Sequence, residues 1–152
     1  MIRVLIDTNI LVDFLARREP FYGPARSLMV FAAMGDYELW MSASQVTDLF
    51  YILSNGGARS SSEACKAALR GLRAIVHVAA PGEREVDAAL TAPWEDFEDS
   101  LVCQTAIGLE AQAIVTRNGR DFTRSPIPVF DVDAFFGWME HVHHVAYGEI
   151  RF

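Results

Sequence analysis

Short hydrophobic runs alternate with longer amphipathic segments along the whole chain. The runs at residues 2–6, 37–41, 74–78, 113–116 and 128–130 have the length and composition of buried strands. The segments between them are long enough for helices and carry apolar residues at helical spacing. Strands separated by helices form βαβ units, so the pattern predicts an α/β protein: a three-layer α/β/α sandwich with a central parallel sheet of four or five strands.

Two serine-led segments carry the signature of a helix start. Gln45 follows Ser42 by three residues, and Glu63 follows Ser60 by three. At this spacing the serine and the later side chain each bond the other's backbone amide, an arrangement called a capping box. We therefore expect one helix to begin at Ser42 and another at Ser60.

Length and composition indicate one domain. A chain of 152 residues buries about two-thirds of its unfolded surface in a single core. We expect this domain to span residues 1–140, with residues 141–152 as a C-terminal tail. The residues are 51% hydrophobic, but the longest apolar runs are too short to cross a membrane, and we expect no secretory leader. Cys65 and Cys103 stand alone in apolar segments, which predicts core packing and a cytoplasmic protein.

The formal net charge of −7 excludes binding of nucleic acid through a broad basic face. A polyanion must therefore be bound locally. Arg117, Arg120 and Arg124 cluster in one predicted loop, and the planar guanidinium group suits phosphate recognition. The alternative is a solvated loop without a ligand.

Polar residues follow two of the predicted strands directly. Asp7, Thr8 and Asn9 come after the run at 2–6, and Asn118 lies two residues beyond the run at 113–116. In open parallel sheets ligands bind at the carboxyl ends of the strands, which share one edge. The two junctions therefore predict a site at this edge, whereas the alternative is that Asp7 only caps the following helix.

Further acids lie on the predicted helices. Asp48 interrupts a strongly apolar helical segment, where a carboxylate needs a partner. Asp96, Glu98 and Asp99 open another helix. Acids in a first turn also favourably oppose the helix dipole, and Asp96 has the position of a cap, so this second group has a purely structural explanation as well.

Carboxylates brought together from separate segments repel one another and raise each other's pKa. Such a cluster persists readily when a cation neutralises it. Oxygen ligands select a hard ion such as Mg²⁺ or Mn²⁺. Because such an ion polarises phosphate and activates water, the acids predict phosphoryl transfer or phosphodiester hydrolysis.

Four segments, in this order, resemble the PIN-domain nucleases, and among them the toxin-type (VapC-like) ribonucleases of bacterial toxin–antitoxin pairs. Residues 5–11 read Leu-Ile-Asp-Thr-Asn-Ile-Leu, and Ser42 is followed six residues later by Asp48. Residues 96–99 read Asp-Phe-Glu-Asp, and residues 115–118 read Val-Thr-Arg-Asn with Asp121 close behind. The match spans nearly the whole chain.

The resemblance implies a compact α/β/α fold and Mg²⁺- or Mn²⁺-dependent cleavage of RNA. By position it makes Asp7 and Asp99 the principal metal ligands. It makes Asp48 a further ligand or a water-positioning carboxylate, and Asn118 a weaker member of the site. It also implies an RNA substrate, a small antitoxin protein as partner and no membrane, and members of the family are often homodimers.

Two positions depart from the family pattern. Asp48 stands where the family typically has glutamate, and Asn118 where it often has aspartate. One negative charge is therefore missing, which leaves the number of metal ions open. Asp96 and Asp121 are the candidates to compensate for it.

Two other functions stay open at this point. Because Asp48 is shorter than the usual glutamate and Asn118 is uncharged, the chain is alternatively a catalytically weak PIN-like module that binds protein or RNA. An aspartyl-phosphate phosphatase would use Asp7 with a second aspartate at the position of Asn9, and a lysine, for which Lys66 is the only candidate. The tail contains neighbouring histidines that are either a metal-binding cluster or surface residues: His141, His143 and His144.

Overall fold

The computed structural model describes residues 1–147 and confirms the expected α/β/α architecture. Within these residues, five parallel strands form one sheet in the order β3-β2-β1-β4-β5. The strands are β1 (Arg3–Ile6), β2 (Glu38–Ser42), β3 (Val76–Ala79), β4 (Ala113–Val115) and β5 (Val129–Phe130). The helices are α1 (Thr8–Leu15), α2 (Tyr22–Ala33), α3 (Ala43–Leu53), α4 (Ser62–Arg73), α5 (Glu83–Thr91), α6 (Phe97–Gly108) and α7 (Val132–His143), with 3₁₀ turns η1 (Arg59–Ser61) and η2 (Gly119–Phe122).

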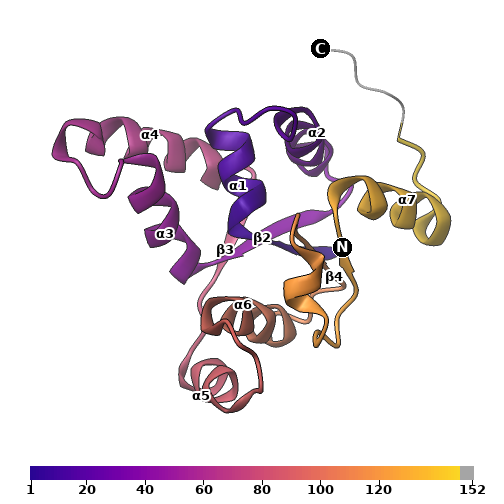
Figure 1. Ribbon diagram of the computed structural model, residues 1–152. Helices are drawn as coiled ribbons and strands as arrows, with labels where there is room; N and C mark the ends of the chain where they lie inside the picture. The colour runs from indigo at the N-terminus through magenta and orange to yellow at the C-terminus, as the bar shows by residue number, and fades with distance from the viewer. Residues whose placement is uncertain (148–152) are drawn as a thin grey trace.

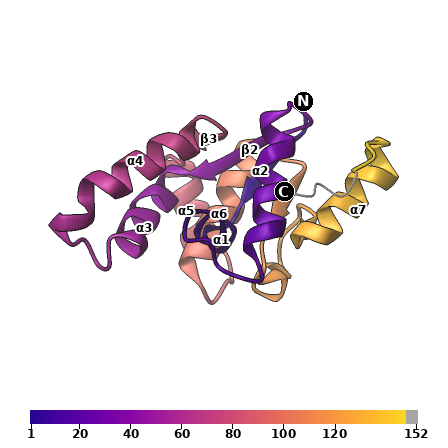
Figure 2. The ribbon, with the colours of Figure 1, turned by 90° about the horizontal axis from the view of Figure 1, so that it is seen from above.

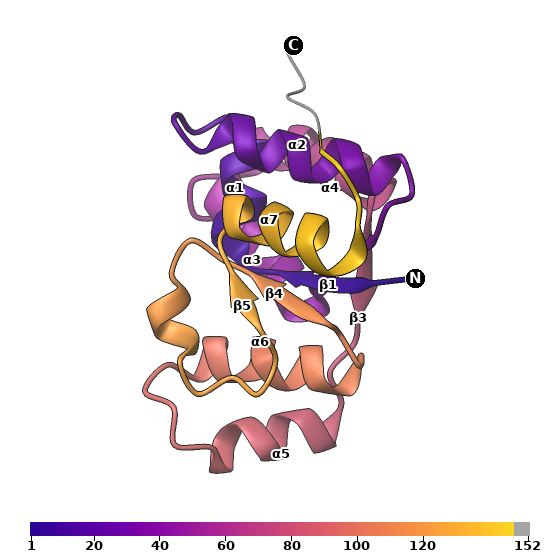
Figure 3. The same cartoon turned by 90° about the vertical axis from the view of Figure 1, so that its right-hand side faces the viewer.

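Helices cover both faces of the sheet (Figure 1). α1, α2 and α7 lie on one face, and α5 and α6 lie on the other; Figure 3 shows the sheet between these two layers. The α3–α4 pair and α7 lie at opposite ends of the molecule (Figure 2). No helix within residues 1–147 is long and apolar enough to cross a membrane.

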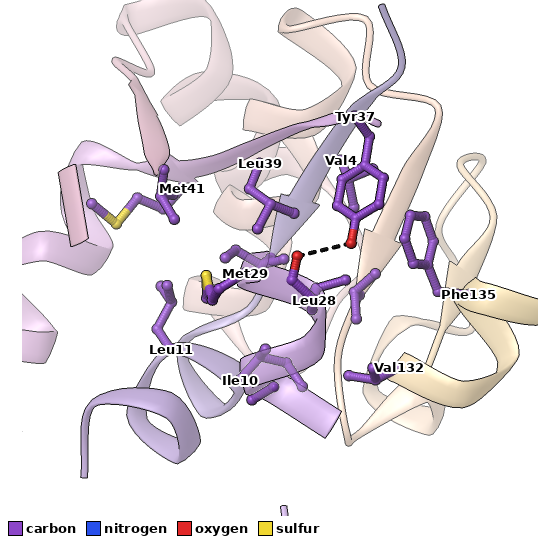
Figure 4. Close-up of a cluster of buried hydrophobic side chains, with 14 of the residues drawn as sticks. Val4, Ile10, Leu11, Leu28, Met29, Tyr37, Leu39, Met41, Val132 and Phe135 are labelled. Carbon is purple, nitrogen blue, oxygen red and sulfur yellow. Dashed lines mark hydrogen bonds between the residues drawn. The ribbon is translucent and has the colours of Figure 1, made fainter. Parts of the chain in front are cut away.

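Each face of the sheet carries its own hydrophobic core, because successive side chains of a strand point to opposite faces. Val4 and Ile6 of β1 pack with α1, α2 and α7, whereas Leu5 packs with α6. Figure 4 shows the first core, in which the Tyr37 hydroxyl donates to the backbone oxygen of Leu28 at 2.8 Å. Burying each such large side chain contributes about 1.5–3 kcal/mol of transfer free energy, so the two cores hold the sheet edge rigidly in place.

Aromatic side chains of α2, of α7 and of the residues after α7 belong to the first core, and Cys103 belongs to the second. Phe135 is fully buried, and Phe31 and Phe136 meet edge to face with 5.6 Å between ring centroids. Tyr147, beyond α7, packs on the same rings. Cys65 and Cys103 are both buried and free, as expected. Residues 148–152 of the expected tail lie outside the described residues.

One of the two expected capping boxes is present. Ser42 caps α3: its amide donates to Gln45 Oε1 at 2.7 Å, and its hydroxyl accepts from the Ser44 amide at 3.3 Å. The second prediction is wrong, because Ser60 lies inside the turn η1, which leads directly into α4. Ser61 is already in helical conformation at the N-cap and makes no side-chain cap.

Arg117, two residues beyond β4, ties this edge of the sheet to α1. Its Nε donates to Asp13 Oδ2 at 2.6 Å and its Nη2 donates to Asp13 Oδ1 at 3.2 Å. The guanidinium group also lies over the Phe21 ring, 4.1 Å from its centroid. Because Asp13 is fully buried, its charge is compensated through Arg117. Arg117 is therefore a structural residue, and the interpretation as a phosphate ligand does not apply to it.

Arg117→Ala leaves the Asp13 carboxylate buried without its cation. We expect the free energy of unfolding to fall by about 3 kcal/mol, as for other broken buried ion pairs. Urea denaturation followed by circular dichroism measures this change. Arg120→Ala, at an exposed position in the same loop, is the control and should alter stability by no more than about 0.5 kcal/mol. Equal unfolding midpoints for Arg117→Ala and the parent protein would show that the pair is not structural.

Candidate active site

Asp7 lies at the carboxyl end of β1 and is almost completely buried. Its amide donates to the Val115 oxygen of the neighbouring strand β4 at 2.9 Å, which fixes its backbone in the sheet. Its side chain also caps α1, because Oδ1 accepts from the Thr8 amide at 2.7 Å. The capping and site interpretations of Asp7 are thus compatible, because one oxygen caps the helix and the other faces the sheet edge.

Thr116, one residue beyond β4, holds the second oxygen of Asp7. The Thr116 hydroxyl donates to Asp7 Oδ2 at 2.7 Å and accepts from the Asn9 side-chain amide at 3.1 Å. Asn9 Nδ2 also donates to Asp7 Oδ2 at 3.1 Å. Asn118 enters this network through its backbone, since its amide donates to the Thr116 hydroxyl at 3.0 Å. Its side chain lies at the surface.

Gln45 joins the second acidic segment to β1. It is fully buried, and its Nε2 donates to the Ile6 oxygen at 2.9 Å and to the Thr8 hydroxyl at 3.2 Å. Asp48 lies about one helical turn further along α3 and is half-buried. The capping box therefore does more than start a helix: it fixes the start of α3, the helix that carries Asp48, against the strand that carries Asp7.

The third acidic segment begins α6. The Asp96 carboxylate caps the helix by accepting from the Asp99 amide at 3.0 Å, as the structural interpretation of this segment predicts. Glu98 and Asp99 occupy the first turn and face the acids of the other segments. The start of α6 thus combines an ordinary cap with a contribution to the acidic edge.

The acids at this edge repel one another. Burial raises the pKa of Asp99 to about 7, with further contributions from Asp7, Asp96 and Asp121. Burial likewise raises the pKa of Asp7, although the hydrogen bonds from Thr116 and Thr8 partly oppose this.

Glu98 shows the same effect. Its pKa is raised by desolvation and then by the neighbouring charges of Asp48 and Asp7. Charges of the first three segments and of Asp121 thus interact at this edge, whereas the Asn118 side chain is exposed. Glu98 belongs to this group although the sequence pattern does not mark it as a site residue. An acid in the first turn of a helix already has an ordinary helix-dipole explanation.

The donor set fits a hard divalent cation. It consists of carboxylate oxygens whose mutual repulsion a cation would relieve. Within residues 1–147, no three acidic, histidine or cysteine side chains already stand close enough to share a metal ion. Mg²⁺ keeps several water ligands and takes one or two carboxylates together with substrate phosphate. Asp7 and Asp99, whose charges interact, are the carboxylates that would hold such an ion.

A cavity of about 380 Å³ opens beside Asp99. Asp96, Asp99 and Asp121 line it together with Arg120 and Arg124. Asp96 and Asp121, the candidates to replace the negative charge missing at Asn118, thus line the same cavity as Asp99. Two of the three loop arginines, Arg120 and Arg124, line it too.

Two sequence alternatives lose support from the structure. Lys66 lies on α4, half-exposed, and pairs with Glu63 at 3.5 Å, so it does not serve as the lysine of a phosphatase site at Asp7. His143 packs edge to face on Trp138 with 4.7 Å between ring centroids, while His141 lies at the surface. These histidines of α7 are not arranged as a metal cluster within the described residues.

Comparison with known proteins shows which family the sequence matches. The family model described as PIN domain matches residues 3–120 of the chain. No curated protein matches the sequence.

The fold is similar to that of several solved structures. For VapBC2 from Rickettsia felis bound to a DNA fragment from its promoter, the TM-score is 0.64 at 17% identity, over 86% of this chain and 98% of that chain. For VapBC-1 from nontypeable Haemophilus influenzae, the TM-score is 0.62 at 22% identity, over 88% of this chain and 99% of that chain. For Mycobacterium tuberculosis VapC20, described as a Sarcin-Ricin loop cleaving toxin, the TM-score is 0.55 at 16% identity, over 73% of this chain and 86% of that chain. At these identities the likeness shows the fold.

The raised pKa of Asp99 predicts a pH-dependent stability of the metal-free protein. Between its ordinary value of 3.8 and about 7, folded Asp99 keeps a proton that the unfolded chain has lost. The free energy of unfolding therefore falls as pH rises through this range. Urea denaturation in EDTA at a series of pH values should show this fall in the parent protein and a much flatter profile in Asp99→Asn. Parallel profiles for the two proteins would contradict the assignment.

Proposed function

The chain belongs to the PIN domain family, and from that premise we propose that it is a divalent-metal-dependent endoribonuclease. It would hydrolyse RNA phosphodiester bonds as the toxin of a type II toxin–antitoxin pair. The observation that carries the proposal is the convergence of acids from four segments at the carboxyl edge of β1. Burial and the charges of neighbouring acids raise the pKa values of Asp7, Glu98 and Asp99.

Each member of the cluster has a distinct task in this proposal. Asp7 and Asp99 hold Mg²⁺ or Mn²⁺, and Asp48 is a further ligand or positions water. When bound, the cation polarises the scissile phosphate and lowers the pKa of a water molecule. Thr116 and Asn9 keep Asp7 oriented, because their side chains donate to the oxygen that does not cap α1. Asn118 supports this arrangement through its amide.

A toxin role is supported by the structures that the fold resembles. VapBC2 of Rickettsia felis and VapBC-1 of Haemophilus influenzae are named as VapBC assemblies, and VapC20 is named as a toxin that cleaves the Sarcin-Ricin loop. By this analogy the chain acts on RNA and is restrained by a small antitoxin protein.

A catalytically weak PIN-like binding module is the second candidate. It is favoured by the shorter side chain of Asp48 and by the absence, within residues 1–147, of a ready-made cage of three metal-binding side chains. Cleavage assays on transfer, ribosomal and messenger RNAs in metal-free, Mg²⁺ and Mn²⁺ buffers separate the two functions. Metal-dependent cleavage supports the nuclease, and RNA binding without cleavage in every buffer supports the module.

Asp7→Asn and Asp99→Asn should each abolish metal-dependent RNA cleavage. Asp99→Asn removes a charge from a repelling cluster, so the stability of the metal-free protein should hold or rise as activity disappears. Asp7→Asn also replaces an oxygen that accepts hydrogen bonds with an amide nitrogen that cannot, so it should lower stability as well as abolish activity. RNA cleavage and thermal unfolding measure the two effects in parallel. Asp36→Asn, in the turn before β2 and remote from the cluster, is the control. Full activity in either site variant contradicts the assignment.

The length of the side chain at position 48 provides a separate test. If Asp48 reaches the cation only through water, which Mg²⁺ retains readily, Asp48→Glu should tighten Mn²⁺ binding or raise the cleavage rate. Asp48→Ala should lose most of the activity. Single-turnover kinetics measure the cleavage rate, and calorimetric titration measures the affinity for Mn²⁺. An Asp48→Ala protein as active as the parent would make Asp48 structural.

The antitoxin should inhibit by inserting an arginine or lysine into the acidic edge. A cation of the partner would then compete with the metal ion, so Mn²⁺, Asp7→Asn and Asp99→Asn should each weaken the complex. Co-purification from the native host followed by calorimetry with and without Mn²⁺ measures this. A partner that binds Asp7→Asn as tightly as the parent protein rules out this mode of inhibition.

A further inference from the structure

Both acidic and basic side chains line the cavity beside Asp99. The acids are Glu95, Asp96, Asp99 and Asp121, and the bases are Arg120 and Arg124. Carboxylates and guanidinium groups therefore line one cavity, an arrangement suited to a phosphate ligand that a metal ion and cationic side chains bind together.

The two arginines differ sharply from their neighbour Arg117. Arg117 is occupied by Asp13 and by the Phe21 ring. Within the described residues, Arg120 and Arg124 make no hydrogen bond or ion pair, and both are exposed. Their donors are free to bind an anion, and the planar guanidinium group matches phosphate oxygens with two donors at once.

An aromatic ring completes the cavity. Trp94 is half-buried and lines the same space as Arg120 and Arg124. It is held in place by an edge-to-face contact with the buried Phe122 ring, 5.6 Å between centroids. A fixed aromatic surface next to free cations is the combination with which proteins bind single-stranded nucleic acid, because every base can stack on an aromatic face.

We propose that this cavity binds the nucleotide next to the scissile phosphate of a single-stranded RNA, with its phosphate on Arg120 and Arg124 and its base against Trp94. The inference rests on the proposed nuclease function, because Asp99, which would hold the metal ion and with it the scissile phosphate, lines this cavity. It also accounts for the binding of a polyanion by a chain of net charge −7, since a local cation pair replaces the broad basic face that the chain lacks.

The test compares Arg120→Ala, Arg124→Ala and the double variant with the parent protein in Mn²⁺. Each single substitution should raise KM for a short single-stranded RNA about tenfold with little change in kcat, because the arginine binds a phosphate away from the reacting bond. The dependence of log(kcat/KM) on log salt should become shallower by about 0.7 for each phosphate that is no longer neutralised. Arg70→Ala, an exposed arginine on the distant helix α4, is the matched control and should change neither value.

Trp94 is tested by a conservative pair. Trp94→Phe retains an aromatic face, so its KM should stay close to that of the parent, whereas Trp94→Leu should raise KM. Thermal unfolding of both variants shows whether the packing against Phe122 survives. Equal KM values for the two folded variants would show that the RNA base does not stack on Trp94.

Each outcome separates this inference from the proposed function. Cleavage with unchanged KM and salt dependence in the arginine variants overturns the cavity as an RNA site and leaves the nuclease intact. If the double variant instead weakens only the antitoxin complex, the cavity is a protein-binding site. If the parent does not cleave, the RNA stays intact and fluorescence anisotropy measures its binding directly. Arginine-dependent binding then supports the cavity without catalysis, and its absence overturns both proposals.

Discussion

The structure depends on how one buried carboxylate, Asp7, is held at the end of β1. Its two oxygens have separate partners: Oδ1 caps α1 through the Thr8 amide, and Oδ2 accepts from Thr116 and Asn9. These bonds join β1, α1 and the segment after β4. They also hold a charged group where water is largely excluded, at an edge where other acids add to the repulsion. The edge of the sheet is thus built around an electrostatic cost that a cation would offset.

Much of this site follows from local sequence rules. A polar residue directly after an apolar run predicts a site at the carboxyl edge of a parallel sheet, which is where Asp7 lies. The role of Thr116 depends instead on β4 pairing with β1, an adjacency that no local pattern encodes. Glu98 comes close to Asp48 through the way that α6 and α3 are placed on the sheet. Ser60 shows the opposite error: a correct capping spacing is overridden by the turn that precedes α4.

The loop after β4 illustrates why residue type alone does not assign a role. Arg117, Arg120 and Arg124 look equivalent in the sequence. In the fold Arg117 compensates the buried Asp13, so its removal acts on stability, while the other two reach the cavity next to the acids. A structural ion pair and a free cation pair are separated by only a few residues of one loop, and their variants should therefore behave differently.

The central claim is that the acids at the end of β1 form a site for a divalent cation. Thermal unfolding of the parent protein during a Mn²⁺ titration tests it most directly, because a ligand that binds the folded state raises Tm by mass action. The account predicts that Tm rises steadily with Mn²⁺ concentration, and that Asp99→Asn removes most of this rise while Asp36→Asn keeps it. A Tm that does not respond to Mn²⁺, or that rises equally in Asp99→Asn, would contradict the account.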